Sequence, residues 1–255
     1  MVGGSGSDYY VVDNYRDVVI ENANEGTDSV FVTGNPTGYL TTYYLPSNVE
    51  NLYFGDYLRK GFGNNFNNLI QGNKFDNTIE GNGGNDHLYG NGGNDQLYGG
   101  DGTDDLYGGI GNDSLLGGNN NDSLNGEAGS DYLYGGLGQD ILNGGADNDY
   151  LYGQEGQDTL TGGSGADRFY IQTDNTRLTD TITDFSRESL DKIYLLGTTV
   201  SSFRGYSTSP ALNAVTYWRS GYDTIVSFNN NGSTHDIILK NYSGEFTASE
   251  IIFWV

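Results

Sequence analysis

The sequence predicts an all-β protein built around a two-sheet solenoid, because three registers of one nine-residue period run through its middle. A glycine recurs every nine residues from Gly63 to Gly162, and an apolar residue follows each glycine by seven positions. Asn or Asp stands two positions before each apolar residue. The apolar positions are Ile70, Ile79, Leu88, Leu97, Leu106, Leu115, Leu124, Leu133, Leu142, Leu151, Leu160 and Phe169. Helical periodicity is scarce elsewhere, so the repeat determines the fold.

Each nonapeptide combines a turn with a short strand. In Gly99–Tyr107 the first six residues have turn chemistry, and the last three form a strand whose middle residue faces inward. Two nonapeptides then make one coil of 18 residues with two turns and two strands, and the array holds six such coils. Ordering each repeat costs about 9–18 kcal/mol of backbone entropy, whereas burying one Leu returns about 1.5–3 kcal/mol. The coils therefore need a further source of stability.

Charge and composition exclude several classes of partner. The 255 residues carry a formal net charge of −23, which argues against nucleic acids and anionic membranes and favours multivalent cations. There is no cysteine, so disulfides and thiolate metal sites are excluded. Met1 is followed by neither a basic nor an apolar segment, so we expect no cleavable N-terminal signal and no membrane span.

Ten aspartates in register are the candidate metal ligands. They align along the turns, and no Lys or Arg lies between Gly81 and Asp167 to relieve their repulsion. Calcium fits, since it takes six to eight oxygen ligands in flexible geometry, whereas zinc prefers His or Cys and magnesium a stiffer octahedron. The candidate ligands are Asp86, Asp95, Asp104, Asp113, Asp122, Asp131, Asp140, Asp149, Asp158 and Asp167.

Composition divides the chain into three regions. Residues 1–62 are an N-terminal β-rich segment, 63–170 the twelve nonapeptides, and 171–255 a C-terminal β-rich cap with a secretion region. Gly3–Val11 is one isolated further copy of the repeat. Residues 63–80 are expected to be a calcium-free start, because they carry Phe66 and Phe75 in place of turn glycines and Asn in place of Asp. Flanking strands are predicted at 9–12, 18–20, 30–32, 43–45, 181–185, 192–196, 224–228, 236–240 and 251–255, with 229–232 as a hairpin turn.

The consensus Gly-Gly-x-Gly-x-Asp-x-apolar-x resembles the RTX (repeats-in-toxin, haemolysin-type) calcium-binding family, and Gly99–Tyr107 matches it closely. The resemblance implies a parallel β-roll in which Asp side chains and turn carbonyls hold calcium between turns stacked on one edge. Partners 18 residues apart then form eight pairs, Asp86/Asp104, Asp95/Asp113, Asp104/Asp122, Asp113/Asp131, Asp122/Asp140, Asp131/Asp149, Asp140/Asp158 and Asp149/Asp167. The implied carbonyl ligands are Gly99, Gly100, Gly102, Gly108, Gly109, Gly111, Gly135, Gly136 and Gly138. Eight ions would add +16 to −23 and leave about −7.

The resemblance continues beyond the array. Asp180–Phe185 and Asp191-Lys192-Ile193 are similar to the segment that follows the roll in secreted proteases, lipases and alginate epimerase modules. Residues 246–253 resemble the C-terminal export region of such proteins. This similarity implies a bacterial protein exported by a type I secretion apparatus to the cell surface or medium.

The outward strand positions show a second pattern. Strands 18 residues apart stack, so one sheet displays six tyrosines, against two on the other. They form either a stabilising aromatic ladder or a docking face for a polysaccharide or protein partner. These residues are Tyr98, Tyr132, Tyr134, Tyr150, Tyr152 and Tyr170.

No catalytic motif is present, neither His-Glu-x-x-His nor Gly-x-Ser-x-Gly, so a non-enzymatic function is expected. The sequence thus favours a secreted calcium-binding module that folds when it binds calcium outside the cell. Two alternatives stay open: an extracellular adhesive or polysaccharide-binding protein, and a detached accessory module of a secreted protease, lipase or alginate epimerase.

Overall fold

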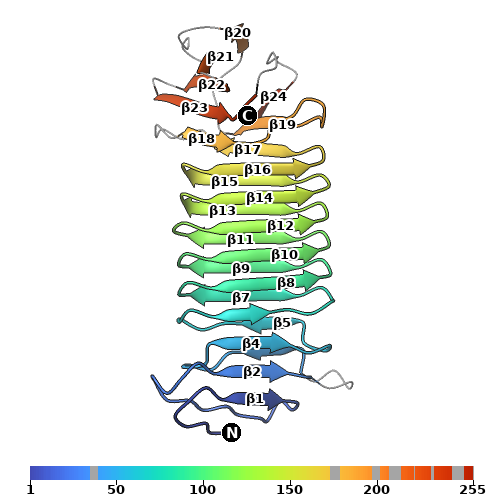
Figure 1. The fold of residues 1–255 in the computed structure, drawn as a ribbon, viewed down its shortest axis with the longest axis vertical. Helices are drawn as coiled ribbons and strands as arrows, with labels where there is room; N and C mark the ends of the chain where they lie inside the picture. The colour runs from blue at the N-terminus through green and yellow to red at the C-terminus, as the bar shows by residue number, and fades with distance from the viewer. Residues whose placement is uncertain are drawn as a thin grey trace.

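The chain forms one elongated stack of β-strands, as Figure 1 shows. The computed structural model describes residues 1–34, 40–172, 179–196, 202–206, 214–220, 222–230, 233–242 and 250–254. Every regular element among them is a strand, and the strands fall into two sheets. The prediction of an all-β parallel roll is confirmed.

The larger sheet holds 14 strands and runs along the whole molecule. Its strands follow in spatial order: β1 (Tyr9–Val12), β2 (Ser29–Val32), β4 (Asn51–Phe54), β6 (Leu69–Gln71), β8 (His87–Gly92), β10 (Asp105–Ile110), β12 (Ser123–Ala128), β14 (Ile141–Ala146), β16 (Thr159–Ser164), β18 (Thr179–Ile182), β23 (Ser233–Leu239), β22 (Asp223–Asn230), β21 (Ala214–Ser220) and β20 (Ser202–Tyr206).

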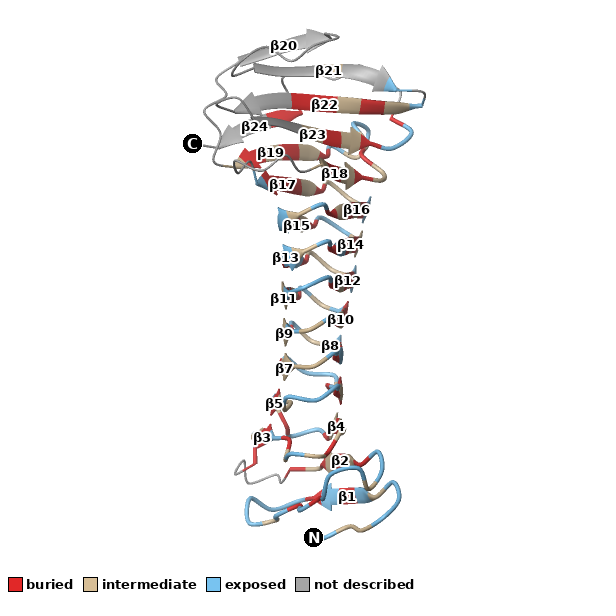
Figure 2. Ribbon diagram, turned by 90° about the vertical axis from the view of Figure 1, so that its left-hand side faces the viewer, coloured by how far each residue is buried: buried red, intermediate tan, exposed pale blue. Residues whose placement is uncertain are grey.

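The second sheet holds 10 strands and faces the first. From the C-terminal end it contains β24 (Ile251–Trp254), β19 (Lys192–Leu196), β17 (Arg168–Gln172), β15 (Tyr150–Gly156), β13 (Tyr132–Gly138), β11 (Ser114–Asn119), β9 (Gln96–Asp101), β7 (Thr78–Gly83), β5 (Lys60–Phe62) and β3 (Thr42–Tyr44). In Figure 2 the array is a narrow column with these two layers side by side.

The predicted coil of 18 residues is confirmed by the strand register. Leu106 pairs with Leu88 on one side and Leu124 on the other, in parallel. All twelve apolar repeat positions are at most 1% exposed. Consecutive coils thus stack one inward side chain on the next and give a single thin core between the sheets.

The strands are longer than the three residues predicted for each repeat. β10 contains the expected Asp105–Tyr107 and then continues through Gly108 to Ile110. The extension arises because stacked turns also pair in register, as Gly109 does with Glu127 and Ile110 with Ala128. The turns are therefore tighter than the sequence suggested.

The flanking segments add strands to the same two sheets. Parallel pairing runs from β1 through β2 and β4 to β6, so the N-terminal strands continue the stack of the array. The strand predicted at 18–20 is wrong, since that segment makes only an isolated bridge between Val2 and Ile20. β4 and β5 were not predicted. At the other end β22 and β23 form the expected antiparallel hairpin, whose turn residues 231–232 lie outside the described residues.

Candidate calcium sites

The ten aspartates form two ladders along the turns. The backbone N–H of each aspartate donates to Oδ1 of the aspartate one coil further on, as Asp104 does to Asp122 at 2.8 Å and Asp122 to Asp140 at 2.9 Å. All eight predicted pairs make this contact, at N–O distances between 2.7 and 3.0 Å. The structure therefore brings together every pair that the spacing predicted.

The second oxygen of each ladder carboxylate is buried without a partner. All ten aspartates are at most 3% exposed, and Oδ2 of each lacks any hydrogen bond. Leaving a buried acceptor unsatisfied costs roughly 1–3 kcal/mol, and more when the group is charged. Ten such atoms in one fold indicate that something else satisfies them.

Burial also perturbs the protonation of these groups. Desolvation, the largest cause, raises the pKa of Asp122 and Asp131 to about 7 and that of Asp149 to about 8. Hydrogen bonds from the backbone oppose the shift, while neighbouring ladder aspartates add to it. Without a counter-charge, the folded ladder therefore favours protonated carboxyl groups near neutral pH.

Turn carbonyls converge on the same unpartnered oxygens. The point where a Cβ would stand on Gly99 lies 2.4 Å from Oδ2 of Asp104 and 2.6 Å from the carbonyl oxygen of Gly117. The same arrangement places the predicted carbonyl of Gly99 beside Oδ2 of Asp86, that of Gly108 beside Oδ2 of Asp95, and that of Gly135 beside Oδ2 of Asp122. Glycine is thus required at the first repeat position, because any side chain would occupy the space between these oxygens.

The other predicted carbonyl donors line the contact between successive turns. The carbonyl oxygens of Gly100, Gly111 and Gly138 point at Gly118, Gly129 and Gly156 of the next coil, where a Cβ would lie within 2.2 Å of them. Gly102, Gly109 and Gly136 face carbonyl oxygens of the preceding coil and have φ of 143°, 111° and 116°. Asn120 and Asp147, which replace turn glycines, adopt φ of 74° and 77°, as expected for these residue types.

Both ladders extend past the array through residues that were not predicted as ligands. Asp158 N donates to Oδ1 of Asp180 at 3.0 Å, and Asp167 N donates to Oδ1 of Asp191 at 3.1 Å. Burial raises the pKa of Asp191 to about 6. The signal was present, because each of these aspartates stands two positions before an apolar residue, Ile182 or Ile193, as in the repeats. The changed spacing of 22 and 24 residues concealed it.

At the N-terminal end asparagine takes the place of the unpartnered carboxylates. Asn68 Oδ1 accepts from the N–H of Asn64, whose side-chain Nδ2 donates to the carbonyls of Pro46 and Val49, each at 2.8 Å. Asn73 and Asn77 repeat this arrangement one nonapeptide later. An amide can satisfy turn carbonyls by itself, which supports the expectation that residues 63–80 need no ion.

The donor set fits calcium. Each gap between stacked turns offers a carboxylate oxygen without a partner, a second carboxylate one coil away and carbonyl oxygens beside them. Calcium prefers such hard, negatively charged oxygen donors. The set contains none of the nitrogen or sulfur ligands that zinc prefers. Bound calcium would supply the positive charge that offsets repulsion among the aspartates.

The tyrosines of the smaller sheet stack into ladders. Ring centroids of Tyr132 and Tyr150 lie 4.4 Å apart, and those of Tyr134 and Tyr152 4.6 Å apart. Tyr170 stacks on Tyr152 at 4.1 Å and is only 6% exposed, so its inclusion in a docking face is wrong. Tyr194, on β19, covers its other side at 4.5 Å. Tyr98 stands apart from these stacks, because Leu116 is its partner in the next strand.

Comparison with known proteins identifies the array. The family model described as RTX calcium-binding nonapeptide repeat (4 copies) matches residues 62–97, 83–115, 98–133, 107–142, 116–151 and 134–169. Residues 62–169 thus belong to the RTX calcium-binding nonapeptide repeats. No curated protein matches the chain.

Solved structures with some likeness to the chain come from bacterial enzymes. The AlgE6R2 subunit of Azotobacter vinelandii mannuronan C5-epimerase is 29% identical over 59% of this chain and 88% of that one, with a TM-score of 0.32. The AlgE6R3 subunit of the same enzyme is 22% identical over 74% and 80%, with a TM-score of 0.30. The extracellular lipase LipA of Serratia marcescens is 15% identical over 88% and 45%, with a TM-score of 0.22.

The described residues include no helix that is long and apolar enough to span a membrane.

Proposed function

We propose that this chain is a secreted, non-catalytic calcium-binding module whose array folds when calcium binds. The observation that carries the proposal is the burial of ten aspartate Oδ2 atoms without a partner, in a segment without a single Lys or Arg from Gly81 to Asp167. The thin core cannot offset this charge alone, so metal binding supplies folding free energy.

The two ladders suggest more sites than the eight first expected. Asp180 and Asp191 each make the same N–H to Oδ1 contact as the array pairs, which adds Asp158/Asp180 and Asp167/Asp191 to the set. We therefore propose eight ions between coils of the array and two further positions at its C-terminal end.

Calcium-dependent folding also suits export. A chain that stays unfolded inside the cell, where calcium is scarce, can cross a type I secretion channel and fold outside. Extracellular calcium-binding modules typically have dissociation constants of about 10⁻⁴–10⁻³ M, which suits binding where calcium is plentiful. The support for this step is the resemblance of residues 246–253 to a C-terminal export region. Positions 243–249 lie outside the described residues.

The proposal is tested by far-ultraviolet circular dichroism of the full chain. With chelator at neutral pH we expect the array to lose its β-signal, and with calcium we expect a cooperative gain. Magnesium at the same concentration is the matched control and should restore much less. Equal β-signal with chelator and with calcium would overturn calcium-dependent folding.

A second candidate function is polysaccharide binding by the tyrosine face, and the exposure of Tyr132, at 41%, favours it. Its ring stacks on that of Tyr150, so the two side chains lie side by side on this sheet. Replacing Tyr132 and Tyr150 with Ser should weaken glycan binding on an array in calcium while leaving the number of bound ions unchanged. The control replaces Tyr89 and Tyr107, which stack at 4.8 Å on the other sheet. Unaltered glycan affinity in the first variant would eliminate this candidate.

A further inference from the structure

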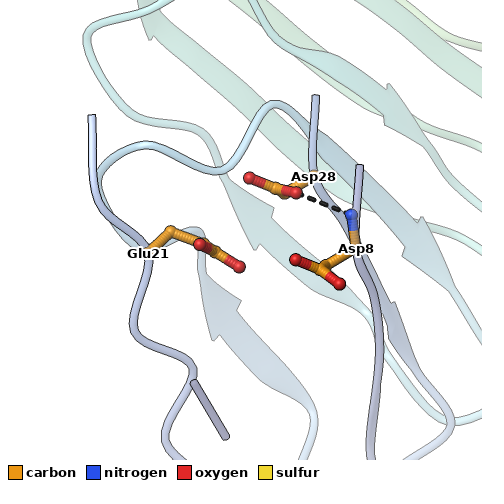
Figure 3. A group of neighbouring side chains, drawn as sticks. All are labelled: Asp8, Glu21 and Asp28. Carbon is orange, nitrogen blue, oxygen red and sulfur yellow. Dashed lines mark hydrogen bonds between the residues drawn. The ribbon is translucent and has the colours of Figure 1, made fainter. Parts of the chain in front are cut away.

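A cluster of three carboxylates lies outside the matched repeats, at the N-terminal end of the solenoid. Figure 3 shows Asp8 and Asp28, which directly precede β1 and β2, facing Glu21 from the connection between these strands. One carboxylate oxygen from each residue lies within 4.8 Å of the others. Asp8 and Asp28 make the same N–H to Oδ1 contact as the ladder pairs, whereas Glu21 has no counterpart in the nine-residue period and adds a third carboxylate.

Glu21 and Asp28 are buried and Asp8 is partly buried, and the cluster is incompletely satisfied. Asp28 is 1% exposed and Glu21 7% exposed, and both Oδ2 of Asp8 and Oε2 of Glu21 are buried without a hydrogen-bond partner. The remaining contacts hold the other oxygens in place, because Asp28 Oδ1 accepts the N–H of Asp8 at 2.7 Å and Glu21 Oε1 accepts the Tyr10 hydroxyl. None of the ion pairs between described residues includes these three carboxylates.

Gly3 keeps the space beside Glu21 and Asp8 open. A Cβ on Gly3 would lie 2.1 Å from Oε1 of Glu21 and 2.6 Å from Oδ2 of Asp8, so only glycine leaves this space open. The connection that carries Glu21 is fixed at several points, since Asn48 Nδ2 donates to the Glu21 carbonyl at 3.1 Å and Ile20 N to the Met1 carbonyl at 2.9 Å.

Three carboxylates gathered in one largely buried cluster favour a cation. If all three ionise, they bring a charge of −3 into one cluster, and burial together with the charges of Asp28 and Asp8 raises the pKa of Glu21. The donors are all carboxylate oxygens, which select a hard cation, and the irregular arrangement suits the flexible coordination of calcium better than the octahedron of magnesium.

We propose that Asp8, Glu21 and Asp28 bind one calcium ion beside β1 and β2. β1 is the terminal strand of its sheet and exposes Tyr9 and Val11, at 62% and 49%. The ion fixes the 13–28 connection against β1 and β2, at a site outside the eight aspartate pairs of the array.

Hydrogen exchange of the full chain, measured by mass spectrometry during a calcium titration, tests this site. In the wild type, calcium should protect the amides of 13–28. Glu21→Gln keeps the acceptor for Tyr10 but removes one charge, so the calcium concentration for half-protection of this segment should rise by about tenfold or more. Protection of 81–170 should stay as in the wild type. Glu25→Gln is the matched control, because Glu25 lies in the same connection and outside the cluster.

The sign of the effect separates a metal ligand from a structural carboxylate. In chelator Glu21→Gln should exchange no faster than the wild type, because it relieves repulsion, whereas in calcium it should exchange faster. Equal loss of protection in both conditions would mean a structural role only. An absence of calcium-dependent protection at 13–28 in the wild type would also overturn the proposal. Calcium-independent exchange at 81–170 would instead contradict the proposed function and leave this site standing.

Discussion

Replacing Asp131 by Asn should remove two calcium ions from the array, whereas replacing Asp86 should remove one. Asp131 lies between two carboxylate neighbours, since its Oδ1 accepts from Asp113 N at 2.7 Å and its own N–H donates to Asp149 at 2.8 Å. Asp86 has a carboxylate neighbour only on one side, Asp104, because Asn68 stands on the other. Asn preserves the Oδ1 acceptor and replaces the unpartnered Oδ2 by an amide nitrogen, which cannot bind a cation.

The magnitude follows from linkage between binding and folding. With calcium at about 100 times its dissociation constant, each ion stabilises the folded state by about 2.7 kcal/mol. Asp131→Asn should then lower the free energy of unfolding by about 5 kcal/mol and Asp86→Asn by about 3 kcal/mol. The mutation also removes a buried carboxylate oxygen without a partner, which is itself destabilising. Both losses are therefore smaller by roughly 1–3 kcal/mol.

Two measurements on the full chain check this prediction. Equilibrium dialysis followed by atomic emission counts the ions bound per chain, and denaturant unfolding followed by circular dichroism gives the stability in calcium. Asp147→Asn is the matched control, since Asp147 is exposed, lies in the same array and adopts φ of 77°, which Asn tolerates. If Asp131→Asn loses no more ions than this control, Oδ2 is not a ligand. If it loses as many as Asp86→Asn, the ions do not bridge adjacent coils.

Three further predictions address the turns, the core and the pH dependence. Gly102→Ala should destabilise the calcium-bound array by about 1–3 kcal/mol or more in denaturant unfolding, because Gly102 has φ of 143° and its Cβ would lie 1.7 Å from the Gly84 carbonyl oxygen. The control Thr103→Ala, at an exposed neighbour, should keep the stability of the wild type. Equal stability of the two variants would disprove the close approach. Leu124→Ala should lower the free energy of unfolding by about 2–5 kcal/mol in the same assay, because Leu124 is 1% exposed between stacked coils. The control is Leu137→Ala, at an exposed position of the array. An equally small change in both variants would show that the column of apolar residues is not a packed core. In chelator, acidification from pH 8 to 5 should increase β-structure. Burial raises the pKa of Asp122 and Asp131 in the folded state from 3.8 to about 7, so below pH 7 the folded state binds more protons than the unfolded state. The folded state therefore gains stability as pH falls below 7 and loses it as pH rises through 7. Half-saturating calcium should rise over the same acidification, and a loss of β-signal on acidification in chelator would contradict the assigned burial.

The array was predictable because its period carries both the core and the ligands. The column of apolar residues from Ile70 to Phe169 and all eight Asp pairs follow from two nonapeptides per coil. The length of each strand was not predictable, since glycine-rich turns give no strand signal and pair only because the coil beneath them has the same shape. Gly109 pairs with Glu127 for this reason.

Most flanking strands were predicted, but their continuity with the array was not, because they keep the register of its strands while their turns vary in length. Asp8 and Asp28 are 20 residues apart, Asp28 and Glu50 are 22 apart, yet each donates the same N–H contact to the next carboxylate. A turn at the edge of a solenoid can absorb extra residues without disturbing the sheets, so spacing alone hides the continuity. Glu21 lies within one such insertion, and only folding reveals its neighbours.

The most direct test of the account is anomalous diffraction from crystals of the full chain grown with calcium and exchanged into terbium. The account predicts metal peaks along both turn edges, each beside the Oδ2 atoms of ladder aspartates such as Asp122 and Asp140. Peaks confined to exposed acidic groups such as Asp101 and Asp147, with no metal beside the buried ladders, would contradict it.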